Sequence, residues 1–355
     1  MKYQIGEIFC GAGGIVLGAN ECQYKNATYA HSFLIDYNQD AIDTLHLNNI
    51  QADQILCADV RECKFTEPHK IDLLCFGFPC NDFSVAGERK GLSGKFGPLY
   101  LEGVRAINKL KPKCFLAENV SGLKQHPKAY QQIIQDLKQT GYRVSEKIYK
   151  FNEFGVPQIR QRIILIGIRS DVQMHFQHPE PTGLFATDTY PVITAAEALD
   201  RIPSWATHQE VVKHSDRKVE IIKHLRPGDT VQQGCAYFPR HLNVKPHFRS
   251  NQEKKLRPDK PSPTVDATSS KLYHWNQNRT LTNREYARIQ TFPDTYNFVG
   301  SKKSVKSQIG MAVPPKGAKV ILQRLLETLV QNNITPSEME HPHAQQTNRS
   351  QAPDQ

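Results

Sequence analysis

The sequence predicts an α/β fold: a doubly wound, Rossmann-like sheet with a smaller, irregular second domain. Short apolar runs alternate with helical patterns over the amino-terminal two thirds of the 355 residues. The first apolar run leads into a glycine-rich turn and a helical pattern. Past Arg169 this alternation stops, and prolines recur at 179, 181, 191, 203, 227, 239 and 246. We therefore expect one domain from residues 1–170, completed by 277–335, a second at 171–276, and a disordered tail at 336–355.

The composition is that of a globular protein, with 39% hydrophobic and 23% charged residues. No apolar run reaches the roughly 18 residues of a membrane span, and the amino terminus lacks a signal-peptide pattern. The eight cysteines form no Cys-x-x-Cys pairs and the 14 histidines no His-Glu-x-x-His motif. We expect no zinc site or other metal, no disulfide scaffold, no membrane attachment and a reducing, cytoplasmic environment.

Positive charge is concentrated in one segment. The net charge is +10, and residues 201–260 hold 13 Lys and Arg against 6 Asp and Glu. This excess favours a surface that binds a polyanion, with Arg240, Lys245 and Arg249 as candidate contacts. A solvated basic face is the alternative.

The first strands and helices of the sheet follow from short apolar runs and helical periodicity. Between the first strand and its helix, small residues allow backbone amides to approach a ligand. The expected strands are Gln4–Phe9, Ala30–Ile35 and Ile55–Cys57, and the helices between them are Ile15–Cys22 and Asn38–Leu47.

Two acidic residues end strands of this half of the sheet. Asp36 ends the second strand with Tyr37 beside it, and either binds ribose hydroxyls or caps the following helix. Asp59 follows the third strand and is a candidate acceptor for an adenine amino group, with Val60 as an apolar wall.

A cysteine follows the next predicted strand, Ile71–Phe76. The strand breaks at Gly77 and Pro79, which places Cys80 on a loop at the carboxyl edge of the sheet. Glycines continue through this polar loop as far as Gly97, a composition typical of a lid. The arrangement suggests a nucleophile under a lid, although many cysteines are simply small buried apolar residues.

Further charged residues meet the same edge. The helix Leu99–Leu110 is followed by the strand Lys113–Ala117, which ends at Glu118. Before the strand Ile163–Ile168, alternation places Arg160 and Arg162 on one face, so that both side chains can point into a cleft. A purely structural arginine pair is the alternative. Later helices are expected at Pro127–Thr140, Thr282–Thr291 and Gly317–Val330, with an element at Tyr142–Phe151.

Taken in order, these motifs resemble the DNA cytosine-5 methyltransferase family, of the bacterial restriction-modification type. The resemblance covers about residues 7–169 and 257–315 and rests on a series of short motifs. They are Phe9-x-Gly11-x-Gly13-Gly14, Gly77-Phe78-Pro79-Cys80-x-x-Phe83-Ser84, Glu118-Asn119-Val120, Gln158-x-Arg160-x-Arg162, Pro261-Ser262-Pro263-Thr264-Val265, Gln290-x-Phe292-Pro293-Asp294 and Gly310-x-Ala312-Val313-Pro314-Pro315. Two positions depart from the family pattern: Asn81 stands where Gln is usual, and Met311 where Asn is usual.

The resemblance implies methyl transfer from S-adenosylmethionine to carbon 5 of a flipped-out cytosine in a specific double-stranded DNA sequence. It implies a covalent Cys80 adduct at carbon 6, Glu118 at nitrogen 3, Arg162 at the base carbonyl, Arg160 supporting the loop and Ser84 near the DNA backbone. S-adenosylhomocysteine is then the product. The implied cofactor residues are Phe9, Gly11, Ala12, Gly13, Gly14, Asp36, Tyr37, Asp59, Val60, Pro79, Leu99 and Met311.

The resemblance also implies a monomer acting in the cytoplasm on nucleoid DNA. It implies as a partner a cognate restriction endonuclease that acts on the same site without direct contact. Three alternatives remain at this stage. A tRNA-methylating relative normally carries Cys-Phe-Thr before its final motifs, which this chain lacks. An inactive DNA-binding homologue does not account for the intact Cys80 and Glu118. A dehydrogenase normally carries a full Gly-x-Gly-x-x-Gly motif, which is incomplete in this chain, and it does not account for Cys80 with Glu118.

Overall fold

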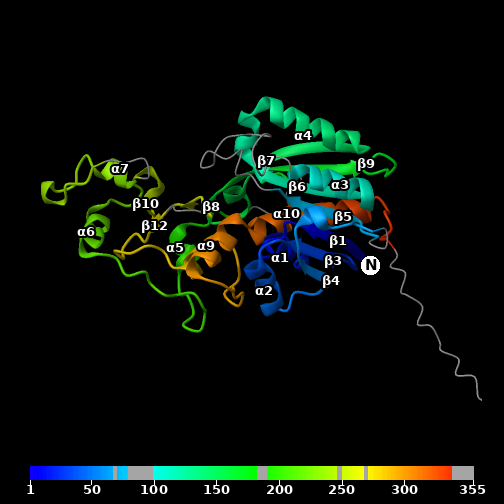
Figure 1. The fold of residues 1–355 in the computed structure, drawn as a ribbon. Helices are drawn as coiled ribbons and strands as arrows, with labels where there is room; N and C mark the ends of the chain where they lie inside the picture. Colours follow the sequence, from blue (N-terminus) through cyan, green and yellow to red (C-terminus); the bar gives the residue numbers. More distant parts are fainter. Residues whose placement is uncertain (67–69, 79–98, 182–189, 246–249, 268–270, 338–355) are drawn as a thin grey trace, which may run out of the picture.

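The structure is organised around one eight-stranded sheet (Figure 1). It is a computed structural model, which describes residues 1–66, 70–78, 99–181, 190–245, 250–267 and 271–337. The strand order is β2-β3-β1-β5-β6-β9-β7, and β4 also pairs with β3. The bounds are β1 Lys2–Ile8, β2 Gln23–Tyr24, β3 Ala27–Asp36, β4 Ala52–Cys57, β5 Leu73–Gly77, β6 Cys114–Val120, β7 Tyr142–Lys150 and β9 Gln161–Arg169.

The central strands are parallel, and the chain reverses its direction of winding beside β1. Strand β1 pairs with β3 on one side and with β5 on the other, and β5 pairs with β6, all in parallel. Strand β9 then runs antiparallel to both β6 and β7. The carboxyl ends of β1, β3, β5 and β6 therefore meet at one edge, where open α/β sheets bind their ligands.

Helices cover both faces of the sheet, as a doubly wound fold requires. Alternate residues of β5 show this, because Leu73 and Cys75 join one core cluster while Leu74 and Phe76 join the other. The first cluster includes α1 (Gly14–Asn20) and α10 (Pro315–Gln331), and the second includes α3 (Tyr100–Leu110) and α4 (Pro127–Gln139). Helix α2 (Gln39–Leu47) packs against β3 and β4.

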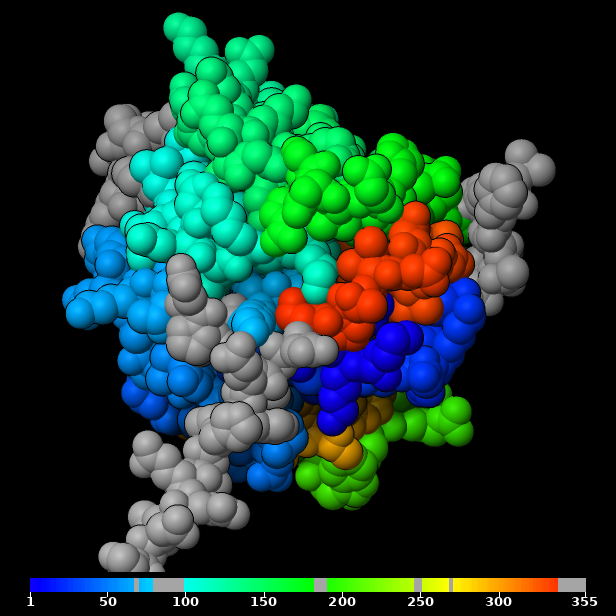
Figure 2. Space-filling model, turned by 90° about the vertical axis from the view of Figure 1, so that its right-hand side faces the viewer, coloured from blue at the N-terminus to red at the C-terminus, as the bar shows by residue number. Residues whose placement is uncertain are grey.

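The carboxyl-terminal segment returns to the first strands of the sheet. The Tyr3 hydroxyl donates to the Ile334 carbonyl at 2.5 Å, and the Ser337 N–H donates to Asp72 at 2.9 Å. Figure 2 shows the red and orange carboxyl-terminal segment packed against the blue amino terminus. The described chain is thus anchored as far as Ser337, one residue past the predicted start of the tail, and residues 338–355 lie outside the described residues.

Residues between 195 and 273 contribute a second lobe (Figure 1). Its small core unites Ile222, Leu225, Val231, Leu242 and Tyr273. It contains α5 Ala195–Leu199, α6 Asp216–His224, α7 Val231–Gly234, the short turns η6 Arg240–Leu242 and η7 Ser250–Gln252, and the strands β10 Glu253–Lys255, β11 Ser262–Pro263 and β12 Lys271–Tyr273. Strand β11 pairs with β8 (Gln158–Ile159), and α5 contacts α8 (Asn283–Ile289), so these elements join the two lobes.

The predicted elements of the sheet are present, with ends shifted by a few residues. The clearest omission is α9 (Lys302–Met311), whose polar residues give little apolar periodicity. Helix α6 was also missed, because the prolines around it mask its pattern. Within the described part of the chain, no helix combines the length and hydropathy needed to cross a membrane.

Candidate active site

Two neighbouring strands bring the predicted nucleophile loop and the predicted acid to one place. Gly77, the last residue of β5, pairs with Glu118 in β6. A Cβ built on Gly77 would lie 3.1 Å from Oε2 of Glu118, so the backbone that leads to the loop runs beside the carboxyl. Pro79, Cys80 and Ser84 lie outside the described residues.

Glu118 forms an ion pair with Arg162. Arg162 Nε lies 2.8 Å from Oε1 of Glu118, and only 14% and 11% of these side chains are exposed. Burial raises the pKa of the Glu118 carboxyl, while the nearby Arg162 and Arg160 guanidinium groups lower it. The net shift of the pKa is upward, so Glu118 takes up a proton more readily than an exposed glutamate does.

Arg160 is placed differently from its neighbour. Its side chain is fully buried and donates to three backbone carbonyls, those of Val265, Gly310 and Ala312, each at 2.9 Å. The alternation argument placed both arginines facing a cleft, and for Arg160 this is wrong. The carbonyl groups of two distant segments enclose its guanidinium, which ties those segments to the strand carrying Arg162.

Two buried glutamines extend this framework. Gln158 accepts from the Val265 N–H at 2.8 Å and donates to Gln290 at 2.6 Å, and Gln290 in turn donates to the Ile309 carbonyl at 2.7 Å. Sequence reasoning placed both in motifs but gave neither a role. Their burial could not be foreseen, because each partner is remote in the chain.

Asn119 fixes the chain just before the loop. Its side-chain amide donates to the Phe78 carbonyl at 3.1 Å, and its oxygen accepts from the Val120 N–H at 2.8 Å. Phe78 immediately precedes Pro79 and Cys80. Asn119 is therefore a positioning residue that the sequence signalled only through its place next to Glu118.

The glycine-rich turn after β1 contains three residues with positive φ, a backbone conformation that favours glycine. Phe9 has a φ of 57°, Gly11 of 51° and Gly13 of 80°. The Gly11 N–H donates to Asp36 at 2.8 Å, and the Asn38 N–H donates to the same carboxylate at 2.9 Å. Asp36 thus joins the turn to the end of β3. Asn38, not Asp36, is the N-cap of α2 and accepts from the Asp40 N–H, so the capping alternative for Asp36 is wrong.

Gly13 and Gly14 allow close packing. A Cβ on Gly13 would lie 2.7 Å from the Leu45 side chain, and one on Gly14 would lie 2.2 Å from the Val313 carbonyl oxygen. Ala12 is buried, and its carbonyl accepts from the Tyr296 hydroxyl at 2.9 Å. The turn is therefore held by α2 and by the carboxyl-terminal motifs.

A buried carboxyl lies in β1, one residue before its end. Glu7 is 1% exposed, its Oε2 has no hydrogen-bond partner among the described residues, and burial raises its pKa strongly. A buried polar atom without a partner is uncommon in a native protein. Such an acceptor beside a glycine turn and the Asp36 carboxylate suits the ammonium group of an amino-acid-bearing nucleoside. The residues present therefore fit S-adenosylmethionine.

The remaining predicted cofactor residues occupy varied environments. Tyr37 is 69% exposed and Met311 60% exposed. Leu99 is partly buried at the start of α3. Val60 is 4% exposed and packs in the same core cluster as Phe65; its place as an apolar wall beside an adenine stays a prediction.

Asp59 pairs with Arg61. Its carboxylate accepts from the Arg61 N–H at 3.0 Å and from Arg61 Nε at 2.9 Å, and these hydrogen bonds lower its pKa to about 2. It is therefore ionised and already holds a partner. Its remaining lone pairs are what an adenine amino group would use.

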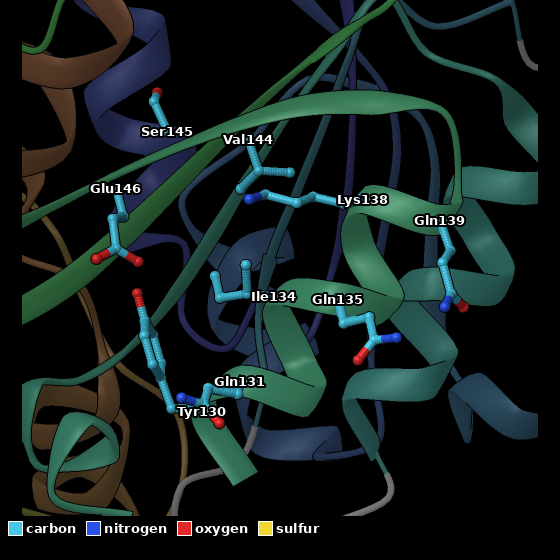
Figure 3. Close-up of a pocket in the computed structure, with 9 residues that line it drawn as sticks. All are labelled: Tyr130, Gln131, Ile134, Gln135, Lys138, Gln139, Val144, Ser145 and Glu146. Carbon is cyan, nitrogen blue, oxygen red and sulfur yellow. The ribbon is translucent and has the colours of Figure 1, made fainter. Parts of the chain in front are cut away.

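Of the predicted DNA contacts, Arg240 and Lys245 are exposed in the second lobe, and Arg249 lies outside the described residues. A separate groove lies between α4 and β7, where Figure 3 shows Tyr130 pointing toward Glu146. None of the predicted site residues lines it. No cluster of metal-binding side chains occurs among the described residues.

The fold and these residues define a class, the S-adenosylmethionine-dependent methyltransferases with a Rossmann-like sheet. A prophage-encoded structure from E. coli, described as a DNA modification methyltransferase, superimposes with a TM-score of 0.69 at 21% identity over 92% of this chain and 99% of its own. The DNMT2 structure from Spodoptera frugiperda has a TM-score of 0.63 at 15% identity, with coverages of 92% and 99%. Both likenesses concern the fold.

The sequence comparisons then give the family. The C-5 cytosine-specific DNA methylase family matches residues 3–327, and this chain belongs to it. Type II methyltransferase M.BbvI of Brevibacillus brevis is 43% identical over 351 residues, 92% of each chain. Type II methyltransferase M.NgoFVII of Neisseria gonorrhoeae is 35% identical, covering 93% of this chain and 88% of its own. The protein is thus a DNA cytosine-5 methyltransferase, and the tRNA alternative is not favoured.

Proposed function

We propose that Cys80, Glu118 and Arg162 carry out the methylation of a flipped-out cytosine in double-stranded DNA. The observation that carries this proposal is the buried Glu118–Arg162 ion pair beside Gly77, at the strand end that leads to Cys80. Pro79 and Cys80 lie outside the described residues, so the role of the thiol rests on its place in the sequence and on the family.

The chemistry requires both a nucleophile and an acid. Carbon 5 of cytosine is too weak a nucleophile until the Cys80 thiolate adds to carbon 6. That addition moves negative charge onto the ring, and Glu118 holds a proton at nitrogen 3 to neutralise it. Carbon 5 then takes the methyl group. Loss of the carbon 5 proton and expulsion of the thiolate restore the ring.

The two arginines have separate tasks in this proposal. Arg162 keeps the Glu118 carboxyl oriented and offers its guanidinium to the base carbonyl. Arg160 is a positioning residue, because its donors reach backbone carbonyls and hold the strand that carries Arg162. Asn119 has a similar task at the Phe78 carbonyl.

S-adenosylmethionine, when bound, supplies an electrophilic methyl group, and S-adenosylhomocysteine is then the product. The glycine turn with Asp36, together with the exposed Tyr37 ring, would hold its nucleoside part, and Glu7 would accept from its ammonium. Each Asp36 oxygen accepts one backbone N–H and keeps a lone pair for a ribose hydroxyl. Asp59, Leu99 and Met311 remain candidate neighbours.

Residues 171–276 would then provide target recognition. Within them, residues 201–260 carry the basic excess, including Arg240 and Lys245. This excess suits the DNA backbone, and flipping the base costs a few kcal/mol that such contacts offset. Because the relatives are bacterial type II methyltransferases, we infer a monomeric enzyme that acts on chromosomal DNA in the cytoplasm. A cognate endonuclease would share its target sequence.

The test is transfer of labelled methyl from S-adenosylmethionine to unmethylated genomic DNA and to bulk tRNA. Wild type should label DNA alone, and Cys80→Ala should lose turnover by at least about 10⁴-fold while it still binds DNA. Cys235→Ala, at a half-buried thiol in the second lobe, is the matched control and should stay active. Retained turnover in Cys80→Ala would exclude the proposed nucleophile, and label on tRNA alone would reassign the substrate.

A further inference from the structure

A tight turn joins α6 to α7 in the second lobe. It comprises Arg226, Pro227, Gly228 and Asp229, and the Asp229 N–H donates to the Arg226 carbonyl at 3.1 Å. Proline at the second position and glycine with a φ of 96° at the third are typical of a type II turn. The Gly228 N–H donates to Lys255 of β10, and the Lys255 N–H donates back to Asp229. The turn is therefore fixed on both sides.

Tyr237 holds the first residue of this turn. The Tyr237 hydroxyl accepts from the Arg226 backbone N–H at 3.1 Å and donates to Asp229 at 2.8 Å. The Arg226 guanidinium carbon lies 4.2 Å from the centre of the Tyr237 ring. Backbone, hydroxyl and ring together determine where this guanidinium lies, so little side-chain freedom remains for a ligand to remove.

The charge of Arg226 is not neutralised within the described residues. Arg226 is exposed, and no described carboxylate forms an ion pair with it. The nearby Asp229 carboxylate is instead engaged by Tyr237. Two neighbouring cations of the lobe differ, since Lys218 pairs with Glu253 and Arg217 donates to the Leu242 carbonyl. Arg226 thus presents its guanidinium N–H groups to solvent.

We propose that Arg226 is a specificity-determining residue that reads a guanine of the target sequence with two of these N–H groups. This inference rests on the proposed role of residues 171–276 in DNA recognition. In the major groove guanine offers two acceptors in one plane, O6 and N7, which match the arginine fork. A phosphate accepts from many directions, and a mobile cation serves it equally well. A guanidinium held against an aromatic ring therefore favours a base edge.

The experiment compares wild type with Arg226→Lys, Arg226→Ala and Tyr237→Phe. Each is expressed in a host without cytosine-5 methylation, and bisulfite sequencing of the host DNA gives the sequences that are methylated. Rates on purified duplexes that differ at one guanine then measure discrimination. Arg201→Lys is the matched control, because Arg201 is an exposed arginine of the same region that already pairs with Asp200. Thermal melting establishes that each variant is folded.

Arg226→Lys keeps the charge but cannot bind two acceptors in one plane. We expect it to relax discrimination at a single guanine position by about tenfold to a hundredfold, while other positions of the site are kept. Arg226→Ala should do the same and also lower activity overall. Tyr237→Phe keeps the ring but loses both hydroxyl hydrogen bonds, so it should relax the same position less. Arg201→Lys should match wild type.

Two results would overturn the inference while leaving the proposed function intact. One is an equal loss of activity on every site, with unchanged discrimination between guanine and other bases. In that case the slope of log affinity against log salt concentration should fall by about one phosphate contact, which is the behaviour of a contact to the DNA backbone. The other is wild-type discrimination in all Arg226 variants. If wild type itself methylates no DNA, the proposed function fails, and this inference fails with it.

Discussion

The sheet lobe and the second lobe use arginine in opposite ways. Arg160 and Arg284 are fully buried, and their guanidinium groups donate mainly to backbone carbonyls. Arg226 and Arg240 are exposed and form no ion pair with a described carboxylate. A buried charge is tolerated only when its donors are satisfied, so Arg160 and Arg284 are committed to fixing the backbone. The exposed pair remains available to a ligand.

The difference separates two tasks of one enzyme. In the proposed mechanism, chemistry on the base needs Glu118 and Arg162 held within tenths of an ångström, and a framework of buried hydrogen bonds would provide this. In the proposed function, recognition needs side chains that meet DNA, and a small lobe with few buried residues would provide these. We therefore expect substitutions in the sheet lobe to change rate and stability, and substitutions in the second lobe to change the choice of DNA sequence.

The largest effect is expected at the buried carboxyl. Glu118→Gln removes the group that we propose holds a proton at nitrogen 3, and turnover should fall by about 10²–10⁴-fold with little change in cofactor affinity. Because the Glu118 pKa is raised, the wild-type rate should also decrease as the pH rises through that pKa.

Glu146→Gln is the matched control, since Glu146 forms a partly exposed ion pair with Lys124 and lies on β7, two strands away from the strand that carries Glu118. Single-turnover rates and cofactor titration measure the two quantities. An unchanged rate in Glu118→Gln would contradict the role given to this residue.

The next largest effect is the loss of stability when a buried arginine is replaced, compared with an exposed one. Arg160→Met removes the side-chain donor of the Val265 and Gly310 carbonyls, while the Ala312 carbonyl keeps the hydrogen bond from Gln290. It should lower the free energy of unfolding by about 3–5 kcal/mol. Arg226→Met should change it by less than about 0.5 kcal/mol, as expected of an exposed side chain. Urea denaturation of both variants measures the two losses of unfolding free energy. Similar losses would contradict the contrast between buried and exposed arginines.

A buried histidine should make the stability of the sheet lobe sensitive to pH. Burial lowers the pKa of His31 to about 4. Between pH 6.5 and 4 the unfolded chain binds a proton at this residue that the folded protein excludes. Stability from this group is therefore full above about pH 6.5 and falls by up to about 3 kcal/mol as the pH approaches 4.

His31→Gln should remove this part of the pH dependence, whereas the exposed His46→Gln should leave it in place. His178, whose pKa burial also lowers to about 4, will contribute a similar slope in all three proteins. Denaturation curves at several pH values measure the effect. Parallel profiles for wild type and His31→Gln would contradict it.

The smallest effect compares two helix caps of the same type. Thr282 caps α8 and Thr230 caps α7, and both form a complete capping box. Thr282 is buried, while Thr230 lies at the surface of the second lobe. Thr282→Ala should cost about 1–2 kcal/mol and Thr230→Ala about 0.5 kcal/mol in unfolding free energy. Thermal melts of the two variants measure these costs, and equal losses would show that burial of the cap has no effect.

Local patterns predicted the parts of the fold that depend on neighbouring residues. The run from Ile71 to Phe76 became β5, and the polar residue after Lys113–Ala117 became the buried Glu118. Helix α9 was missed because its residues have no strong apolar period. The site was foreseen best where its residues follow strand ends, since parallel strands bring those ends together.

The contacts of individual side chains were not predictable in the same way. Arg160 and Arg162 are two residues apart on one segment, yet one binds carbonyls of Val265 and Gly310 and the other pairs with Glu118. Val60, expected to form an apolar wall for a ligand, is almost fully buried among other apolar side chains. No local pattern distinguishes these cases, because each partner lies far away in the sequence.

The sequence by itself determined the alternation of strands and helices, the order of the motifs and the family, since these depend on residue types and their spacing. Only the tertiary structure decided which arginine is enclosed, in which carboxyl burial raises the pKa and which guanidinium lies over Tyr237. The physical reason is that burial and hydrogen-bond partnership are properties of residues brought together by folding. They exist only once segments such as Gln158–Arg162 and Gly310–Ala312 are in contact.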